Sequence, residues 1–197
     1  MSMMDALQQR RTYYNINKEL PVSIEEVRSL VDRLTELVPD AFNMKSSRIV
    51  TVSGSRQDVL WDAIYDVFAG KVAREKIDSF RAGAGTILYF YDRSIVAAMQ
   101  EQFPLYAENF PVWANHSSAM LQLAIWSSLR ELGIGASLQH YNPVIDARVR
   151  ELFDLPEEYV LVAEMAFSNR MGLTLCGIVE EPAPKPAENI RERVQHF

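Results

Sequence analysis

The stretch that decides the fold is PVWANHSSAMLQLAIWSSLRELG, residues 111–133. It begins with proline and ends with glycine, and neither residue occurs between them. Proline is favoured in the first turn of a helix, and glycine is favoured just after its end. The pattern therefore predicts a helix over residues 111–132. Because its middle is apolar on most faces, we expect this helix to lie at the centre of the fold.

On either side of this helix, four segments have the composition of strands and the rest of the regular structure is helical. The strands are expected at residues 48–52, 86–91, 134–139 and 160–167. Helices are expected over residues 2–11, 23–38, 71–80 and 94–102 and from residue 55 onward. A further helix is expected over residues 142–153, with Asn142 as its N-cap and Pro143 as its first residue. Because strands and helices do not alternate strictly, we expect one α+β domain spanning residues 1–197.

The composition argues against several classes of protein. A formal charge of −6 disfavours a nucleic-acid partner held by phosphate contacts. Cys176 is the only cysteine, so an intramolecular disulfide and a cysteine-rich zinc site are excluded. No apolar stretch is long enough to span a bilayer and residues 1–11 do not resemble a secretory signal, so we expect no membrane partner and a cytoplasmic location.

Searches for chemistry-bearing motifs return little. Gly83 and Gly85 give G-x-G ahead of a strand, which is not the dinucleotide-binding arrangement. The histidines His116, His140 and His196 lack ligand spacing, so no metal site is expected, and His116 on the long helix is expected to be buried. This shortage of acids, bases and nucleophiles fits a protein whose cofactor carries the chemistry, and fits a binding protein without chemistry equally well.

Six motifs spread over almost the whole chain have a more specific pattern. They are RRTYY at 10–14, AFNMKSSR at 41–48, FRAGAGT at 80–86, QFPLYAENFPVW at 102–113, LGIGASLQHYNP at 132–143 and ERV at 192–194. In sequence and in order they resemble the nitroreductase family, in particular its fatty-acid-repression-mutant-like branch.

The resemblance implies a three-layer α+β fold, in which a central, mostly antiparallel sheet is flanked by helices. It also implies a homodimer with FMN at the interface and a C-terminal arm, residues 182–197, that reaches across to the other subunit. Pro182, Pro184 and Pro186 suit a stiff extended arm, although the same prolines occur in loose tails. Residues 169–176 look like an insertion relative to the branch.

The resemblance assigns one set of residues to the phosphate end of FMN. Arg10 and Thr12 are expected to hold the phosphate or the ribityl chain, and Arg11 is expected beside the phosphate or the pyrimidine edge. Arg193 is expected to contact the phosphate, and Arg191 is a weaker candidate. The alternative for each arginine is a solvated surface residue.

A second set is assigned to the flavin ring, and no side chain is expected to be catalytic because flavin N5 accepts the hydride. Asn43 of the second subunit is expected to bond the ring or the ribityl chain, whereas Lys45 either contacts the flavin or points to solvent. Arg81 is expected near the N1/O2 edge, with a helix-capping role as its alternative. Leu138, Gln139 and His140 are expected to form a loop that lies against the ring and offers a backbone N–H near N5.

These expectations favour an FMN-dependent enzyme that transfers hydride from NADH or NADPH to small aromatic acceptors. Nitroaromatic compounds, and possibly quinones, are the expected acceptors, and a shared site predicts ping-pong kinetics. Two alternatives stay open. One is a flavin-binding regulatory or stress-response protein with incidental turnover, and the other is an interaction domain without flavin.

Overall fold

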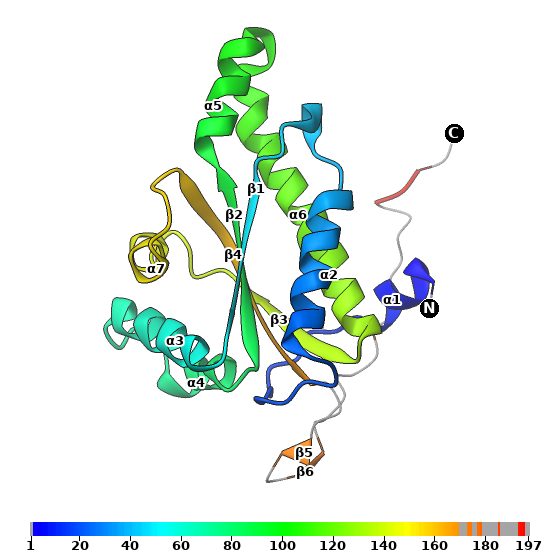
Figure 1. The fold of residues 1–197 in the computed structure, drawn as a ribbon, viewed down its shortest axis with the longest axis vertical. Coiled ribbons are helices and arrows are strands. Elements are labelled where there is room, and N and C mark those ends of the chain that lie inside the picture. The colour runs from blue at the N-terminus through cyan, green and yellow to red at the C-terminus, as the bar shows by residue number, and fades with distance from the viewer. Residues whose placement is uncertain (1, 170–172, 175–176, 179–184, 186–192, 196–197) are drawn as a thin grey trace.

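The computed structural model describes residues 2–169, 173–174, 177–178, 185 and 193–195. Its centre is an antiparallel sheet of four strands in the order β1-β2-β4-β3 (Figure 1). The strands are β1 (Ser47–Ser53), β2 (Gly85–Asp92), β3 (Ile134–Gln139) and β4 (Tyr159–Asn169). All four predicted strands are thus confirmed to within two residues at each end.

Helices cover both faces of this sheet. One layer contains α1 (Met3–Gln9), α2 (Ile24–Leu37) and α6 (Phe110–Glu131), and the other contains α3 (Ser55–Phe68), α4 (Arg74–Arg81) and α7 (Asp146–Phe153) (Figure 1). Side chains of β2 alternate between the layers: Ile87 and Tyr89 join the core under α2 and α6, whereas Leu88 and Phe90 join the core under α3 and α7. The predicted three-layer α+β fold is confirmed.

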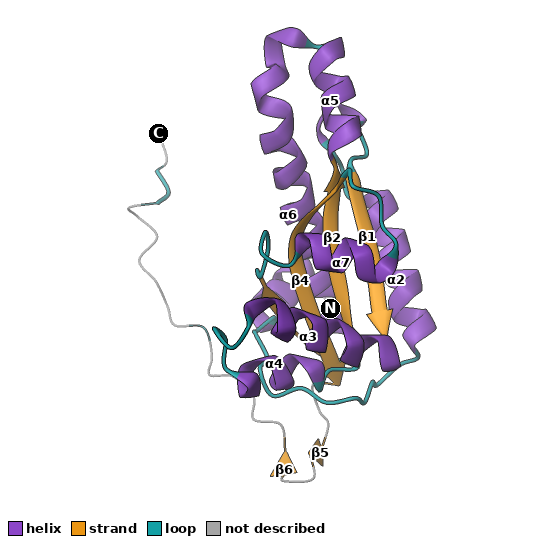
Figure 2. Cartoon of the chain, turned by 90° about the vertical axis from the view of Figure 1, so that its left-hand side faces the viewer, coloured by secondary structure: helices purple, strands orange, loops and turns teal. Residues whose placement is uncertain are grey.

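One end of the molecule extends beyond the sheet. There α5 (Arg93–Gln102), the 3₁₀ turn η2 (Pro104–Asn109) and the first turns of α6 form a projecting helical pair (Figure 2). The 3₁₀ turn η1 (Ala41–Asn43) packs against this pair, because Phe42 lies 4.9 Å from Phe103 and 5.5 Å from Trp113, measured between ring centroids.

The placement of the long helix differs from the prediction. α6 covers one face of the sheet instead of occupying the centre of the fold, and part of its other side is left uncovered by the described residues. Met120 and Leu123 are consequently 45% and 43% exposed, and His116, expected to be buried, is exposed as well.

The start of α7 was also predicted wrongly. Asn142 and Pro143 do not begin the helix, and the bond between them is cis. The side-chain amide of Asn142 donates to the carbonyl of Leu161, 3.2 Å away on β4, and its Oδ1 accepts no hydrogen bond from the described residues, so it does not cap the helix. The first helical residue is Asp146.

The end of the chain is described only in part. β5 (Leu173–Thr174), within the region expected to be an insertion, pairs antiparallel with β6 (Gly177–Ile178), which follows that region. Of the expected arm at 182–197, only Lys185 and residues 193–195 are described, and exchange of this arm in a dimer stays a prediction. The helices among the described residues include none both long and apolar enough to cross a membrane.

Candidate functional site

The first part of the site is the chain segment that follows α1. Ser2 and Asp5 cap this helix reciprocally, and the helix ends at Gln9. The next residues extend along the open edge of β3, where Thr12 forms a parallel bridge with Ala136 and the Tyr13 amide donates to the Ala136 carbonyl at 3.1 Å. Arg10, Arg11 and Thr12 are therefore fixed beside β3.

Gly135 allows this close approach. A Cβ atom at position 135 would lie 2.8 Å from the Tyr13 ring, which is too close for any side chain. We expect Gly135→Ala to push residues 10–13 off the sheet edge and to lower the free energy of unfolding by about 1–3 kcal/mol, the usual cost of overpacking. Chemical denaturation measures this effect. Adding Tyr13→Leu to the variant should restore part of the loss, and a lack of any recovery would contradict the proposed contact.

Three cations gather at this segment, although the chain is acidic overall: they are Arg10, Arg11 and Lys185. The guanidinium of Arg10 stacks 4.0 Å above the Trp126 ring of α6. The pKa of Lys185 is lowered, first by burial and then by the charges of Arg10 and Arg11. Burial and the charge of Arg11 likewise lower the pKa of Arg10. The Lys185 ammonium also donates to the Leu7 carbonyl.

Within the described part of the chain, no carboxylate is paired with this cluster. Among the described residues, the Nη1 atoms of Arg10 and Arg11 are buried and have no hydrogen-bond partner. Two orphaned guanidinium donors and an ammonium suit the oxygens of a phosphate group. Sequence reasoning missed Lys185. Its signal is a single lysine within a run of prolines that suits a stiff extended arm.

The other predicted phosphate residues are less well defined. Arg193 is exposed, and Arg191 lies outside the described residues. Their contacts with FMN stay predictions.

The second part of the site is the loop that leaves β3. Leu138 and Gln139 are half-buried and His140 is exposed. The Gln139 side chain donates to the Ser137 hydroxyl at 2.8 Å, which turns it back along the strand. The backbone of the loop is held by Glu164 of β4, whose Oε2 accepts the Tyr141 amide at 3.0 Å. Sequence reasoning missed Glu164, a single acid within an apolar strand.

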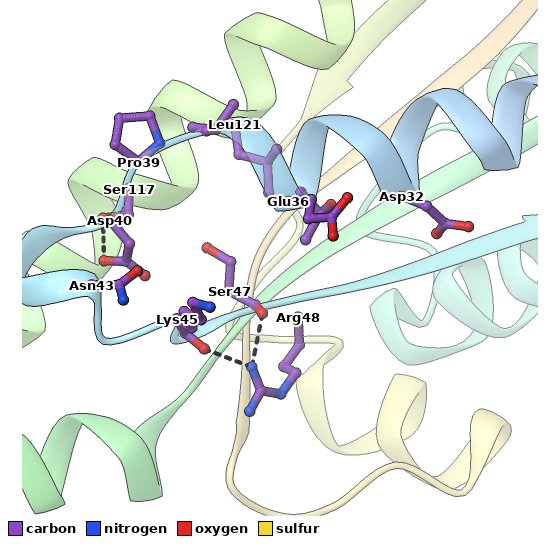
Figure 3. A pocket seen from close by; sticks show the side chains of 12 residues that line it. Asp32, Glu36, Pro39, Asp40, Asn43, Lys45, Ser47, Arg48, Ser117 and Leu121 are labelled. Atoms are coloured by element: carbon purple, nitrogen blue, oxygen red, sulfur yellow. Dashed lines mark hydrogen bonds between the residues drawn. The ribbon is translucent and has the colours of Figure 1, made fainter.

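The third part lies near the end of β1 that adjoins η1. Asn43 and Lys45 line a cavity of about 340 Å³ between α2, β1 and α6 (Figure 3). Asp40 closes one side by accepting from the Ser117 hydroxyl at 2.7 Å and from the Ser46 amide at 3.0 Å. The Arg48 guanidinium, ion-paired with Asp92 at 3.1 Å, donates to the Lys45 carbonyl at 2.9 Å.

The backbone around Asn43 is unusual. Phe42, Asn43 and Lys45 have φ values of 54°, 51° and 53°, in the left-handed region that side chains other than glycine and asparagine seldom adopt. Such strain, about 1–3 kcal/mol per residue, concentrates at functional sites where surrounding contacts enforce it. Among the described residues, Ala69 and Asp154 at helix ends have similar φ values, but only the segment at residues 42–45 gathers three of them, which draws attention to it independently of any motif.

Arg81 is not brought together with the other predicted residues. It ends α4, in the opposite helical layer from Arg10, and its guanidinium pairs with Asp62 at 3.1 Å and with Asp58 at 3.8 Å. Two neighbouring carboxylates would offset much of its field at a flavin. Its approach to the N1/O2 edge stays a prediction.

The cationic and η1 parts of the site occupy different places along α6. Arg10 stacks on Trp126, whereas η1 is tied through Asp40 to Ser117. Nine residues of helix separate these two positions, a distance of about 14 Å. The described residues contain no group of three or more His, Cys, Asp or Glu side chains suited to a metal ion.

Known proteins resemble this chain over most of its length. Residues 7–168 match the model of the nitroreductase family. The nitroreductase FRM2 of Saccharomyces cerevisiae is 31% identical over 167 residues, which are 83% of this chain and 86% of that protein. The putative nitroreductase HBN1 of the same yeast is 30% identical over the same shares.

Solved structures agree with this match. The nitroreductase CinD from Lactococcus lactis, in complex with chloramphenicol, is 34% identical with a TM-score of 0.89, and all of both chains is covered. A putative nitroreductase from Desulfovibrio desulfuricans, in complex with FMN, has the same fold with a TM-score of 0.71 at 16% identity, covering 100% of this chain and 97% of that one.

Proposed function

Because this chain belongs to the nitroreductase family, we propose that it is an FMN-dependent oxidoreductase that uses NADH or NADPH to reduce nitroaromatic compounds, with quinones as further acceptors. FMN, when bound, supplies the store for the electron pair that passes from donor to acceptor. The protein's own residues then have to bind FMN, orient the donor and the acceptor, and exclude water. Donor and acceptor using one space in turn would give ping-pong kinetics.

The observation that carries this proposal is the unbalanced cation cluster. Arg10 and Arg11 each keep one buried guanidinium nitrogen that has no partner among the described residues. Lys185 is close enough for their charges to lower its pKa. A terminal phosphate would satisfy these donors, which favours FMN over a flavin without phosphate. The loop from Leu138 to His140 begins two residues beyond the Thr12–Ala136 bridge and would then support the ring.

Relatives support the class of acceptor. CinD structures contain chloramphenicol, 4-nitrophenol or nicotinic acid. The last of these shares its pyridine ring with the nicotinamide of the proposed donor, and 4-nitrophenol is a nitroaromatic compound. We infer that the site of this chain accepts small planar aromatic molecules of both kinds in turn.

We further propose that the site is completed in a homodimer. Ser117, where α6 meets the segment that carries Asn43 and Lys45, lies about 14 Å along the helix from Trp126 beside the cation cluster. The surface between them is apolar, because Met3, Met120 and Leu123 line an open groove of about 460 Å³. A second copy seated on α6 would bury this groove and bring Asn43 of the partner subunit towards the loop at 138–140.

Leu123→Asp tests the dimer. A charge placed in the proposed apolar interface should raise the dimer dissociation constant at least about tenfold. FMN affinity should fall with it, because a shared site links the two equilibria. Analytical ultracentrifugation with and without FMN measures both effects. Val59→Asp, on α3 in the opposite layer and similarly exposed, is the matched control. An unchanged dimer in Leu123→Asp would remove α6 from the interface.

The function itself is tested on the purified protein. We expect flavin absorption, FMN released on denaturation, and NADH or NADPH oxidation that depends on a nitroaromatic acceptor such as 4-nitrophenol. Double-reciprocal plots should give parallel lines. A protein that does not bind FMN would refute the proposal. FMN without turnover would favour the regulatory or stress-response alternative. A cytoplasmic location stays a prediction.

A further inference from the structure

Glu164 is a buried acid without an ion-pair partner among the described residues. It lies in the middle of β4 with 0% exposure, paired across the sheet with Leu88 of β2 and Gln139 of β3. Its Oε2 accepts the Tyr141 amide, whereas its Oε1 accepts no hydrogen bond from the residues that the structure describes. Burying an unpaired carboxylate charge costs free energy, so Glu164 has to be neutral or has to gain a partner that balances its charge.

Apart from the Tyr141 amide, the groups facing Glu164 do not stabilise its charge. β2 and β3 present the uncharged Leu88 and Gln139, and α7 presents Asp146, a second acid. Arg150 lies one turn further along α7. Its charge lowers the pKa of Asp146, and its guanidinium donates to the Tyr159 carbonyl at 3.2 Å.

The loop contributes the remaining neighbours. Its titratable group facing Glu164 is Tyr141, whose pKa is raised to about 12 by burial and by the Glu164 charge. Burial raises the pKa of Glu164 to about 8, the Tyr141 hydrogen bond acts against this shift, and Asp146 adds to it. Glu164 is therefore uncharged in most molecules at neutral pH.

We propose that Glu164 is a positioning residue that works as a neutral carboxylic acid, fixing the loop at residues 139–142 through the Tyr141 amide and releasing it on ionisation. The importance of this loop for flavin rests on the proposed function, whereas the hydrogen bond and the burial do not. Ionised Glu164 would need water, which reaches it only when the loop opens.

This role predicts a specific pH dependence. With the loop closed the pKa of Glu164 is about 8, and with the loop open it returns towards its ordinary 4.5. Opening therefore releases a proton. The opening equilibrium should rise about tenfold per pH unit between about pH 5 and pH 8 and level off above pH 8.

Amide hydrogen exchange at Tyr141 in the FMN-free protein measures loop opening. Glu164→Gln keeps an oxygen acceptor but cannot ionise. The exchange rate of an unprotected amide itself changes with pH, and comparing the wild type with this variant at the same pH cancels that change. From pH 5.5 to pH 7.5 the protection of the wild type should fall up to about a hundredfold relative to Glu164→Gln. Glu157→Gln, an exposed residue upstream on the same chain segment, should follow the wild type. Parallel profiles of wild type and Glu164→Gln would overturn the proposal.

FMN titration supplies the second readout. Glu164→Ala, which has no acceptor, should weaken FMN binding about tenfold if one molecule in ten keeps the loop closed, and Glu164→Gln should restore normal affinity. Equal affinity in wild type and Glu164→Ala would show that the loop does not need Glu164 for binding, against the proposal. If the wild type itself binds no FMN, the proposed function fails, and the exchange profile alone decides the role of Glu164.

Discussion

Arg10→Ala is expected to weaken FMN binding about tenfold to a hundredfold. Each hydrogen bond between a charged donor and the phosphate contributes about 1.5–3 kcal/mol, and about 1.4 kcal/mol corresponds to one decade in affinity. The buried Nη1 of Arg10 has no partner in the described part of the chain, so this donor is already in place before any ligand binds. Fluorescence titration of FMN into the flavin-free variant measures the loss.

Two further variants separate charge from geometry at this position. Arg10→Lys keeps the charge but loses the planar group that stacks 4.0 Å above Trp126, so it should recover only part of the affinity. Arg33→Ala removes an exposed arginine from α2 and should leave FMN binding unchanged. If Arg10→Ala bound FMN as tightly as Arg33→Ala does, the cation cluster would not be the phosphate site.

The fold was accessible from sequence because its signals are local. The run at residues 86–91 is apolar on both faces, and only a strand covered on two sides needs such a composition. The start of α7 was not accessible, because it depends on a hydrogen bond from Asn142 to Leu161, 19 positions along the chain. The exposure of Met120 and Leu123 is a similar case, since periodicity identifies an apolar face without identifying what covers it.

The candidate site was accessible only in part. The Arg-Arg-Thr motif identified the segment beside β3, and the structure adds what the motif cannot contain, the stacking of Arg10 on Trp126 and the proximity of Lys185. Glu164 escaped notice because an isolated acid matters only when its surroundings are known. Its side chain lies beside that of Gln139 solely because β3 and β4 pair in this register.

Glu164→Gln is expected to flatten the pH dependence of stability in the FMN-free protein. Glu164 has a pKa of about 8 in the folded state and an ordinary value of 4.5, so the folded state binds the extra proton. Its contribution to stability is fully present below about pH 4.5 and is lost as the pH rises towards 8. At pH 7 the loss amounts to about 3 kcal/mol, since 1.36 kcal/mol corresponds to one pH unit.

The difference between two stability curves tests this expectation better than any single value. Glutamine leaves an amide N–H₂ without a buried acceptor, so Glu164→Gln starts from a lower stability at pH 5. Between pH 5 and pH 8 the wild type should then lose stability relative to the variant by about 1.4 kcal/mol per pH unit. Urea unfolding at four or five pH values measures this slope, with Glu157→Gln expected to run parallel to the wild type. A constant gap between wild type and Glu164→Gln would mean that Glu164 has the same pKa in the folded and unfolded states, which would contradict its role as a neutral acid.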